Sequence, residues 1–311
     1  MKRIYFVIAG LVGIMACNKH LSVETPNLSI SINPSSSTAF VNTIADTFVY
    51  KLGDTTKFLF AGSTGNLMVY TGDATHNYDY KDRKAVLGNT TLSFSSAITN
   101  TGQLNTLSLL ATNKLNGLDS TSIVGANWTD ITNRANLATS ATATASGNIN
   151  LNDLVSSPND SLFVALKYTG ATGTLQPTWT ITNFTVNNIL PDVTYNLTSL
   201  TDALVFSKLR VAPSTSPIWV ASTSSLSITG GAATNPNNTG WIVTKPLYVG
   251  RVTPDVSIPL ININSYTNNA TATGYNYKYA AVGTYKVVFI IFNNTSNDQR
   301  TQMKVFYVKV Q

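Results

Sequence analysis

The 311-residue chain contains one cysteine, two histidines and one glutamate, and each scarcity removes a class of chemistry. Because Cys17 is the only thiol, the rest of the chain cannot form disulfides, zinc–thiolate sites or cysteine nucleophiles. A Ser–His–Asp triad would depend on His20 or His76, and no Gly-x-Ser-x-Gly turn accompanies them. A glycosidase needs two carboxylates, yet Glu24 is the single glutamate and the aspartates suit turns. We therefore expect a protein that is not an enzyme.

Charged residues are also few, at 11 % of the chain, and the formal net charge of +6 is not gathered into a basic block. We therefore expect no nucleic-acid partner. No EF-hand loop or repeated Gly-Asp ladder is present, so we expect no metal and no other cofactor. One alternative stays open, because the turns Asn150–Asp153 and Pro158–Asp160 carry oxygen atoms that suit a structural calcium ion.

The N-terminus has the pattern of a secretion signal. Lys2 and Arg3 precede the apolar run Ile4–Met15, which as a helix would reach about 18 Å and is too short for a bilayer core of about 30 Å. Ile14-Met15-Ala16-Cys17 resembles a bacterial lipobox. We expect a signal peptide over 1–16, lipidation of Cys17, and a polar tether over 17–36. The expected location is the outer membrane, lipid-anchored, on the cell surface or the periplasmic face.

The rest of the chain has the pattern of an all-β protein. Helical periodicity is almost absent, whereas period-2 alternation and short apolar runs between Gly, Asn, Asp or Pro recur throughout. Threonine suits strands, and asparagine and serine suit turns. Many short strands separated by turns predict β-sandwiches.

The two ends of the chain look like two parts of one module. Gly53-Asp54 precedes a strand pattern near the start, and Gly283-Thr284-Tyr285 precedes another near the end. This arrangement resembles the polycystic-kidney-disease-type immunoglobulin-like domain. The resemblance implies an Ig-like β-sandwich whose first part is 37–84 and whose last part is 276–311. The alternative is a pair of small separate sandwiches, one at each end.

The middle of the chain has a different signature. A tryptophan segment, an aliphatic strand and a Trp-x-Ile-x-x-Phe strand follow one another at Trp128–Thr132, Leu162–Tyr168 and Trp179–Phe184. These resemble the jelly-roll modules of Bacteroidota surface proteins. We expect a jelly-roll-like β-sandwich over 85–200 and a connecting β region over 201–275.

Several short motifs together resemble one lipoprotein family of the Bacteroidota, the domain of unknown function numbered 5017. They are Gly53-Asp54, Tyr70–Asp73, Tyr78–Arg83, Trp128–Thr132, Trp179–Ile181 and Gly283–Tyr285. The resemblance extends over nearly the whole chain after Cys17 and implies no established activity. It implies association with outer-membrane transporter complexes and glycan-binding lipoproteins of polysaccharide uptake.

Two places are candidates for ligand binding. In an extended strand, Tyr78, Tyr80 and Asp82 would share one face, with Arg83 on the other. Trp241 follows a polar run and would suit a loop tip. Aromatic rings stack on sugars and polar neighbours bind hydroxyls, but a tyrosine-packed sheet face with a salt-bridged outer side and a tryptophan opening a buried strand are the more ordinary uses of these residues. We expect a non-catalytic accessory glycan-binding lipoprotein; the alternative is a structural or adhesive surface lipoprotein that binds protein partners.

Overall fold

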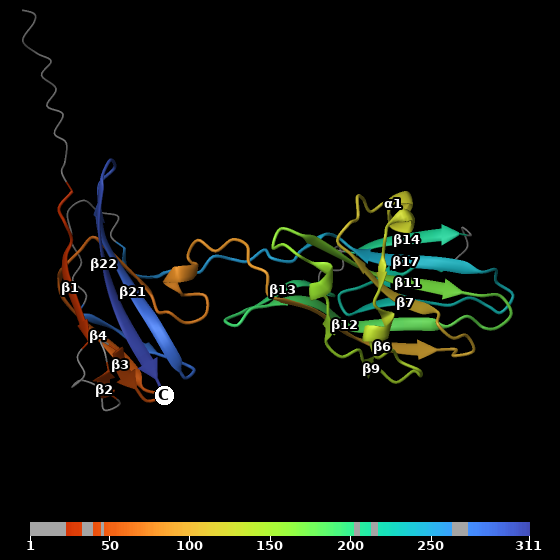
Figure 1. Cartoon of the computed structure of the whole chain (residues 1–311), viewed down its shortest axis with the longest axis horizontal. Coiled ribbons are helices and arrows are strands. Elements are labelled where there is room, and N and C mark those ends of the chain that lie inside the picture. Colours follow the sequence, from red (N-terminus) through yellow and green to blue (C-terminus); the bar gives the residue numbers. More distant parts are fainter. Residues whose placement is uncertain (1–22, 33–39, 45–46, 202–205, 213–216, 263–272) are drawn as a thin grey trace, which may run out of the picture. The chain divides into compact units, whose positions relative to one another are not determined.

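A computed structural model describes residues 23–32, 40–44, 47–201, 206–212, 217–262 and 273–311. The proposed signal peptide and Cys17 lie outside these residues. Contacts divide the chain into two compact units, which we call the first unit (1–81 with 255–311) and the second unit (82–254). Each is described by itself below (Figure 1). Among the described residues, the helical segments are α1 (Ser120–Gly125) and three short 3-10 turns. None of the described helices is long and apolar enough to cross a membrane.

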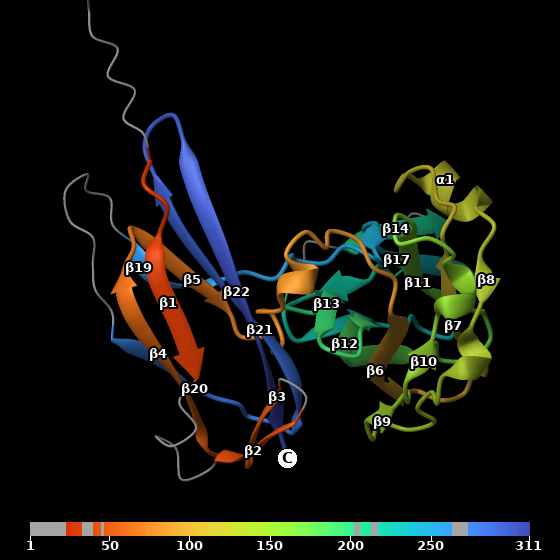
Figure 2. The same ribbon diagram turned by 60° about the vertical axis from the view of Figure 1, so that its left-hand side comes forward.

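The first unit is a sandwich of two sheets made from both ends of the chain (Figure 2). The three-stranded sheet has the order β1 (Asn27–Ile32), β4 (Thr55–Ser63), β20 (Gly274–Lys278). The six-stranded sheet has the order β19 (Ile258–Asn262), β5 (Asn66–Tyr70), β21 (Gly283–Asn294), β22 (Gln299–Val310), β3 (Thr47–Tyr50), β2 (Phe40–Ile44). All neighbours are antiparallel except β22 and β3, which run parallel. β5 and β21 therefore join segments that are more than 200 residues apart in the chain.

Strand β1 lies inside the segment 17–36 that we expected to be a tether, so that expectation needs correction. Leu28, Ile30 and Ile32 alternate with polar residues and are buried. They form part of a core that also contains Phe58, Phe289 and Phe306. The alternation is the ordinary signature of a half-buried strand, and the many Ser, Thr and Asn around it obscured it.

A row of tyrosines closes one end of this core. Tyr277 and Tyr279 pack edge to face with ring centroids 4.9 Å apart, and Tyr279 stacks on Tyr285 at 4.0 Å. The Tyr279 hydroxyl donates to the Thr71 carbonyl at 2.8 Å, and the Tyr277 hydroxyl donates to Asp73 at 2.5 Å. These hydrogen bonds connect β20 and the turn after it to the end of β5.

We expect alkaline pH to destabilise the first unit more than the second. Burial raises the pKa of Tyr50 and Tyr275 to about 12, and burial with a hydrogen bond to Asp73 does the same for Tyr277. Burial also raises the pKa of Tyr279. Unfolded tyrosine has a pKa of about 10, so this stabilisation is complete below pH 10 and is lost as pH rises towards 12.

Calorimetric melts between pH 9 and 12 test this, with tryptophan fluorescence as the control. All four tryptophans lie in the second unit, at positions 128, 179, 219 and 241. In the second unit, burial raises the pKa of Tyr168 to about 12. Equal loss of stability by both units over this pH range would contradict the prediction.

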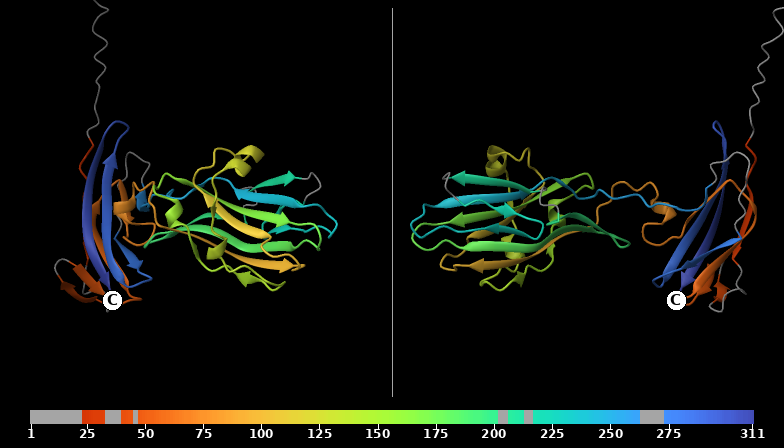
Figure 3. Two further views of the ribbon diagram at one scale, coloured as in Figure 1. Left: turned by 45° about the vertical axis from the view of Figure 1, so that its right-hand side comes forward. Right: turned by 180° about the vertical axis from the view of Figure 1, so that it is seen from behind.

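The second unit is also a sandwich, in which two sheets pack face to face (Figure 3). One has the order β10 (Ile149–Asn150), β6 (Asn89–Thr99), β12 (Thr178–Ile189), β16 (Ser225–Ile228), β15 (Val220–Ala221), with β9 (Thr144–Ala145) on β6 and β13 (Thr194–Ser199) on β12. The other has the order β14 (Phe206–Ala212), β17 (Asn238–Thr244), β11 (Ser161–Gly170), β7 (Leu107–Thr112), β8 (Thr129–Asp130), with β18 (Leu247–Tyr248) on β11.

Strands from 206–248 take part in both sheets of this sandwich, so the region 201–275 is more than a connection. β14 and β17 extend one sheet, and β16 pairs with the centre of the other. Trp179, Trp219 and Ile242 all belong to the large core between the sheets. With this core and the separate core of the first unit, the prediction of an all-β sandwich fold is confirmed.

The two ends of the second unit are hydrogen-bonded to each other. The Val86 N–H donates to the Gly250 carbonyl at 2.7 Å, and the Val252 N–H donates to the Lys84 carbonyl at 3.3 Å. Ala85 and Arg251 form the antiparallel bridge between them. The chain therefore enters and leaves this unit at the same place.

Candidate functional site

The sheet that contains β11 and β17 is apolar on both faces. Val164 and Leu166 of β11 point into the large core, whereas Phe163 and Ala165 belong to a second, smaller cluster on the opposite face. A strand buried on both faces loses its alternating pattern, so something must cover the outer face. Helix α1 and the loops beside it do so, because Ile123 of α1 packs with Phe163 and Val243; Figure 1 shows α1 next to β14.

Helix α1 forms because its first residues supply a cap. The Asp119 carboxylate accepts from the Ser122 N–H at 3.0 Å and from the Ser122 hydroxyl at 2.6 Å, as expected for an aspartate at this position. These hydrogen bonds also lower the pKa of Asp119. The helix buries Ile123 against the sheet and accepts a 2.7 Å hydrogen bond from the Trp128 indole N–H at the Ile123 carbonyl. Trp128 is therefore held in a fixed orientation.

The helix covers only part of the face, and a pocket of about 450 Å³ remains beside it. We call it the tryptophan pocket; its lining residues are Leu110, Val124, Ala126, Asn127, Trp128, Lys167, Thr239 and Trp241. Trp241 is 5 % exposed and Trp128 is half-buried, with ring centroids 5.8 Å apart at an angle of 40°. The Lys167 ammonium lies 5.3 Å from the Trp241 ring centroid.

The polar groups of the tryptophan pocket are neutral or positive. Lys167 forms no ion pair with any residue that the structure describes, and no acidic residue or histidine is among the lining residues. Asn127 and Thr239 add hydrogen-bonding groups at its edge. Two indoles with polar groups beside them form a concave site of mixed polar and apolar character, of a size that suits a small ligand. The lining supplies groups for binding, and it holds neither a paired carboxylate nor a general base of the kind hydrolysis needs.

The expected strand at Tyr78–Arg83 is not formed, so the shared face of Tyr78, Tyr80 and Asp82 was a wrong prediction. Tyr78–Tyr80 is the 3-10 turn η2, because the Asn77 side chain accepts from the Asp79 N–H at 3.0 Å and caps it. Tyr78 packs edge to face on Tyr70 with centroids 5.4 Å apart. Tyr78 therefore packs on the six-stranded sheet of the first unit from a turn beside it.

The other predicted site residues belong to the second unit. Asp82 is exposed at its start. Two nitrogens of the Arg83 guanidinium donate to the two Asp192 oxygens, at 3.4 and 2.8 Å, and the Arg83 side chain is 11 % exposed. Arg83 thus attaches the start of the unit to the loop between β12 and β13. Trp241 lies within β17 rather than at a loop tip, as the buried-strand alternative had it.

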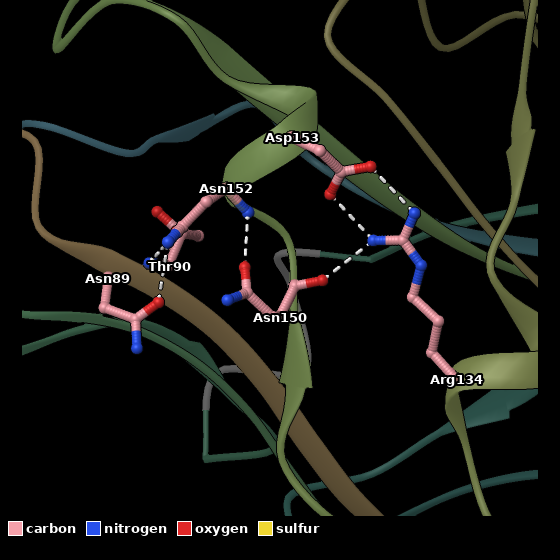
Figure 4. A network of polar contacts seen from close by, with 6 residues as sticks. All are labelled: Asn89, Thr90, Arg134, Asn150, Asn152 and Asp153. Carbon is pink, nitrogen blue, oxygen red and sulfur yellow. Dashed lines mark hydrogen bonds and ion pairs between the residues drawn. The ribbon is translucent and has the colours of Figure 1, made fainter.

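The Asn150–Asp153 turn, one of the two that suit calcium, uses its oxygens within the protein (Figure 4); in the other turn Asp160 accepts from the Ser156 and Ser157 N–H groups at 2.8 and 3.0 Å. Both Asp153 oxygens accept from Arg134, at 2.7 and 2.8 Å, and this ion pair lowers the pKa of Asp153. The Asn150 carbonyl also accepts from Arg134, at 2.9 Å. The Asn152 side chain connects the turn to β6 through Asn89 and Thr90. Within the described ranges, no three His, Cys, Asp or Glu side chains come together as a metal site.

Trp128 and Lys167 were not singled out as ligand-facing residues by the sequence. Trp128 was taken as part of the tryptophan segment of the expected jelly-roll-like sandwich, and Lys167 interrupts the otherwise apolar run Leu162–Tyr168. That run could have indicated the pocket. Its apolar residues lie on both faces of the strand, so its outer face must be covered by other residues. Lys167, near the end of the strand, marks where this cover ends. The position of α1, which decides where the opening lies, follows only from the packing.

Comparisons with known proteins give one family. A model described as Domain of unknown function (DUF5017) matches residues 16–204, which is more than half of the chain. The matched range contains Trp128 and Lys167 but ends before Trp241 and before Gly283–Tyr285. A search of curated proteins found no match, and a search of solved structures found none either.

Proposed function

Because the chain belongs to the family described as Domain of unknown function (DUF5017), whose description leaves activity open, we propose a function from its site. We propose that the protein is a non-catalytic glycan-binding lipoprotein of the cell envelope, which serves a polysaccharide-uptake system. The observation that carries this proposal is the tryptophan pocket, where Trp128, Trp241 and Lys167 meet on the outer face of a β-sheet.

The pocket has the chemistry that sugars require. The faces of sugar rings present C–H groups, which pack on indole rings, while hydroxyls need hydrogen-bonding partners at the edges. Trp241 supplies a floor that a strand holds in place, and Trp128 supplies a wall fixed by its hydrogen bond to Ile123. Such rigid aromatic groups lose little conformational entropy when a ligand binds.

The membrane part of the proposal rests on the sequence. Lipidation of Cys17 would attach the N-terminus to the outer membrane, with the two units on the cell surface or the periplasmic face. Mass spectrometry of the N-terminal peptide from membranes tests it. We expect Cys17 to be the first residue and to carry the added mass of the lipid, and an unmodified peptide that begins elsewhere would contradict it.

The binding experiment uses the full chain, purified in detergent so that any lipid is retained, on a glycan array and then by calorimetry. We expect saturable binding to a polysaccharide. Replacing Trp128 with Ala, or Trp241 with Phe, is expected to weaken it about tenfold, since a central aromatic contact often contributes 1–2 kcal/mol or more. Trp241→Phe retains an apolar ring in the buried position, so the fold should persist.

Tyr80→Ala is the matched control, since it removes an aromatic ring from the first unit. Affinity should be unchanged in this variant, and circular dichroism should show all three variants folded. A loss of affinity in Tyr80→Ala alone would place the site in the first unit and reject the tryptophan pocket. Absence of binding across plant, animal and microbial polysaccharides would reject the proposed function.

A second candidate function is a surface protein that binds protein partners. The observation that favours it is a row of exposed apolar side chains on one face of β22, at Met303, Val305 and Tyr307. Exposed apolar rows of this kind are common at protein interfaces. This candidate predicts that substitution of Val305 by Lys abolishes a partner cross-link on intact membranes and leaves glycan binding unchanged.

A further inference from the structure

A second pocket lies elsewhere in the second unit, where β13 and β18 meet. Its volume is about 310 Å³, and its walls include Tyr195, Leu247, Tyr248 and Arg251. Leu247 and Val252 are buried and form an apolar base. Tyr248 is 53 % exposed and Tyr195 is half-buried. We call it the arginine pocket.

Backbone hydrogen bonds fix the walls of this pocket. The Arg251 N–H donates to the Tyr248 carbonyl at 3.1 Å and closes a turn that brings both side chains to the same region. Gly250 in this turn packs so closely on Pro158 that a Cβ would lie 2.3 Å from the Pro158 carbonyl oxygen. The Tyr195 hydroxyl donates to the Thr253 carbonyl at 3.1 Å. The Tyr195 ring and the backbone of Tyr248 are therefore held in position without a ligand.

Arg251 differs from Arg83 and Arg134 of the second unit in that its guanidinium forms no ion pair with any residue the structure describes. Arg83 pairs with Asp192 and Arg134 pairs with Asp153. Arg251 is anchored through its backbone by the bridge to Ala85, but its side chain is exposed and forms no ion pair or hydrogen bond with any residue the structure describes. No acidic residue lines the pocket. A cation that lines the same pocket as two tyrosines, with no carboxylate in the lining, is complementary to an anion on a ring-shaped ligand.

We propose that the arginine pocket is a second saccharide subsite, and that it selects a sugar residue carrying an anionic group, a carboxylate or a sulfate. The inference rests on the proposed glycan-binding function and names its substrate class. Tyr195 and Tyr248 would contact the sugar ring, and Arg251 would bind the anion through two parallel N–H groups.

The test compares ligands that differ only in charge, using the full chain in detergent and calorimetry. One pair is oligogalacturonate and its methyl ester, and the other is dextran sulfate and dextran. We expect the charged member of at least one pair to bind about tenfold more tightly at low salt, in line with the strength of a charge-assisted hydrogen bond. The preferred pair identifies the anion. Added salt should reduce the preference.

Arg251→Gln should remove this preference and leave the affinity for the neutral member unchanged. Tyr248→Ala, at an exposed position, should weaken both members. Arg300→Gln removes one positive charge from an exposed position of the first unit and should change neither, which separates the subsite from net charge. Equal binding of charged and neutral members, or a preference that survives Arg251→Gln, would overturn the inference while glycan binding itself stands. Absence of binding to every glycan would overturn both.

Discussion

Replacing Trp219 with Ala is expected to lower the stability of the second unit by about 3–5 kcal/mol, the range for loss of a large buried aromatic side chain. Trp219 is 1 % exposed and belongs to the core between the two sheets. Its indole N–H also donates to the Gly240 carbonyl at 3.2 Å, within the buried interior. The variant therefore leaves a cavity and removes a buried hydrogen bond, and both are destabilising.

Calorimetry with tryptophan fluorescence provides the measurement. For a unit of this size we expect the melting temperature to fall by roughly 6–20 °C, while the transition of the first unit stays in place. Val220→Ala is the matched control, because the adjacent side chain is 57 % exposed and should contribute about 0.5 kcal/mol or less. A Trp219→Ala protein that melts like the parent would show that this residue lies outside the core.

Replacing Phe58 with Ala is expected to destabilise the first unit and to leave the stability of the second unit unchanged. Phe58 in β4 packs on Phe289 in β21 and Phe306 in β22, with ring centroids 5.0 and 5.6 Å apart. It therefore joins the two sheets of the first unit, and also joins segments from opposite ends of the chain. We expect the first unit to lose about 3–5 kcal/mol. The transition seen by tryptophan fluorescence should not move, because all four tryptophans lie in the second unit.

Leu59→Ala controls for the position in the strand, since Leu59 is the next residue of β4 and points to the exposed side. Its effect should be small. If Phe58→Ala instead shifts the fluorescence transition as much as the calorimetric one, the two units unfold as a single cooperative body, and the assignment of separate cores to separate transitions is wrong.

The sequence was informative wherever a strand has one buried face. In β6, buried residues alternate with half-buried ones from Thr90 to Ile98, and the apolar residues Leu92, Phe94 and Ile98 at a spacing of two or four make this period readable without a structure. It was less informative where polar residues are buried or where tertiary contacts decide. β1 was hidden in a polar segment, and the strands of 206–248 carry too few apolar residues to show which sheet each one joins.

Among the candidate site residues, too, some have a local sequence pattern and others depend on tertiary contacts. Trp241 was identified because a large aromatic residue after a polar run is conspicuous, although its place in a strand was uncertain. Trp128 and Arg251 depend on features that have no local signature, namely where α1 ends on the sheet and which arginines find a carboxylate. Tyr78–Arg83 failed because the Asn77 cap stabilises a turn that propensity alone does not distinguish from a strand.

The hydrogen-bonded ends of the second unit have a consequence for the order of folding. Uniting β5 with β21 in an unfolded chain would close a loop of roughly 210 residues, the segment between Tyr70 and Gly283, at an entropic cost on the order of 4–5 kcal/mol relative to a very short loop. Once the second unit has folded, Lys84–Val86 and Gly250–Val252 are already neighbours, and most of that cost has been met by the second unit's own contacts. The folded second unit then brings the two chain segments that form the first unit close together. The middle of the chain should therefore fold before its ends.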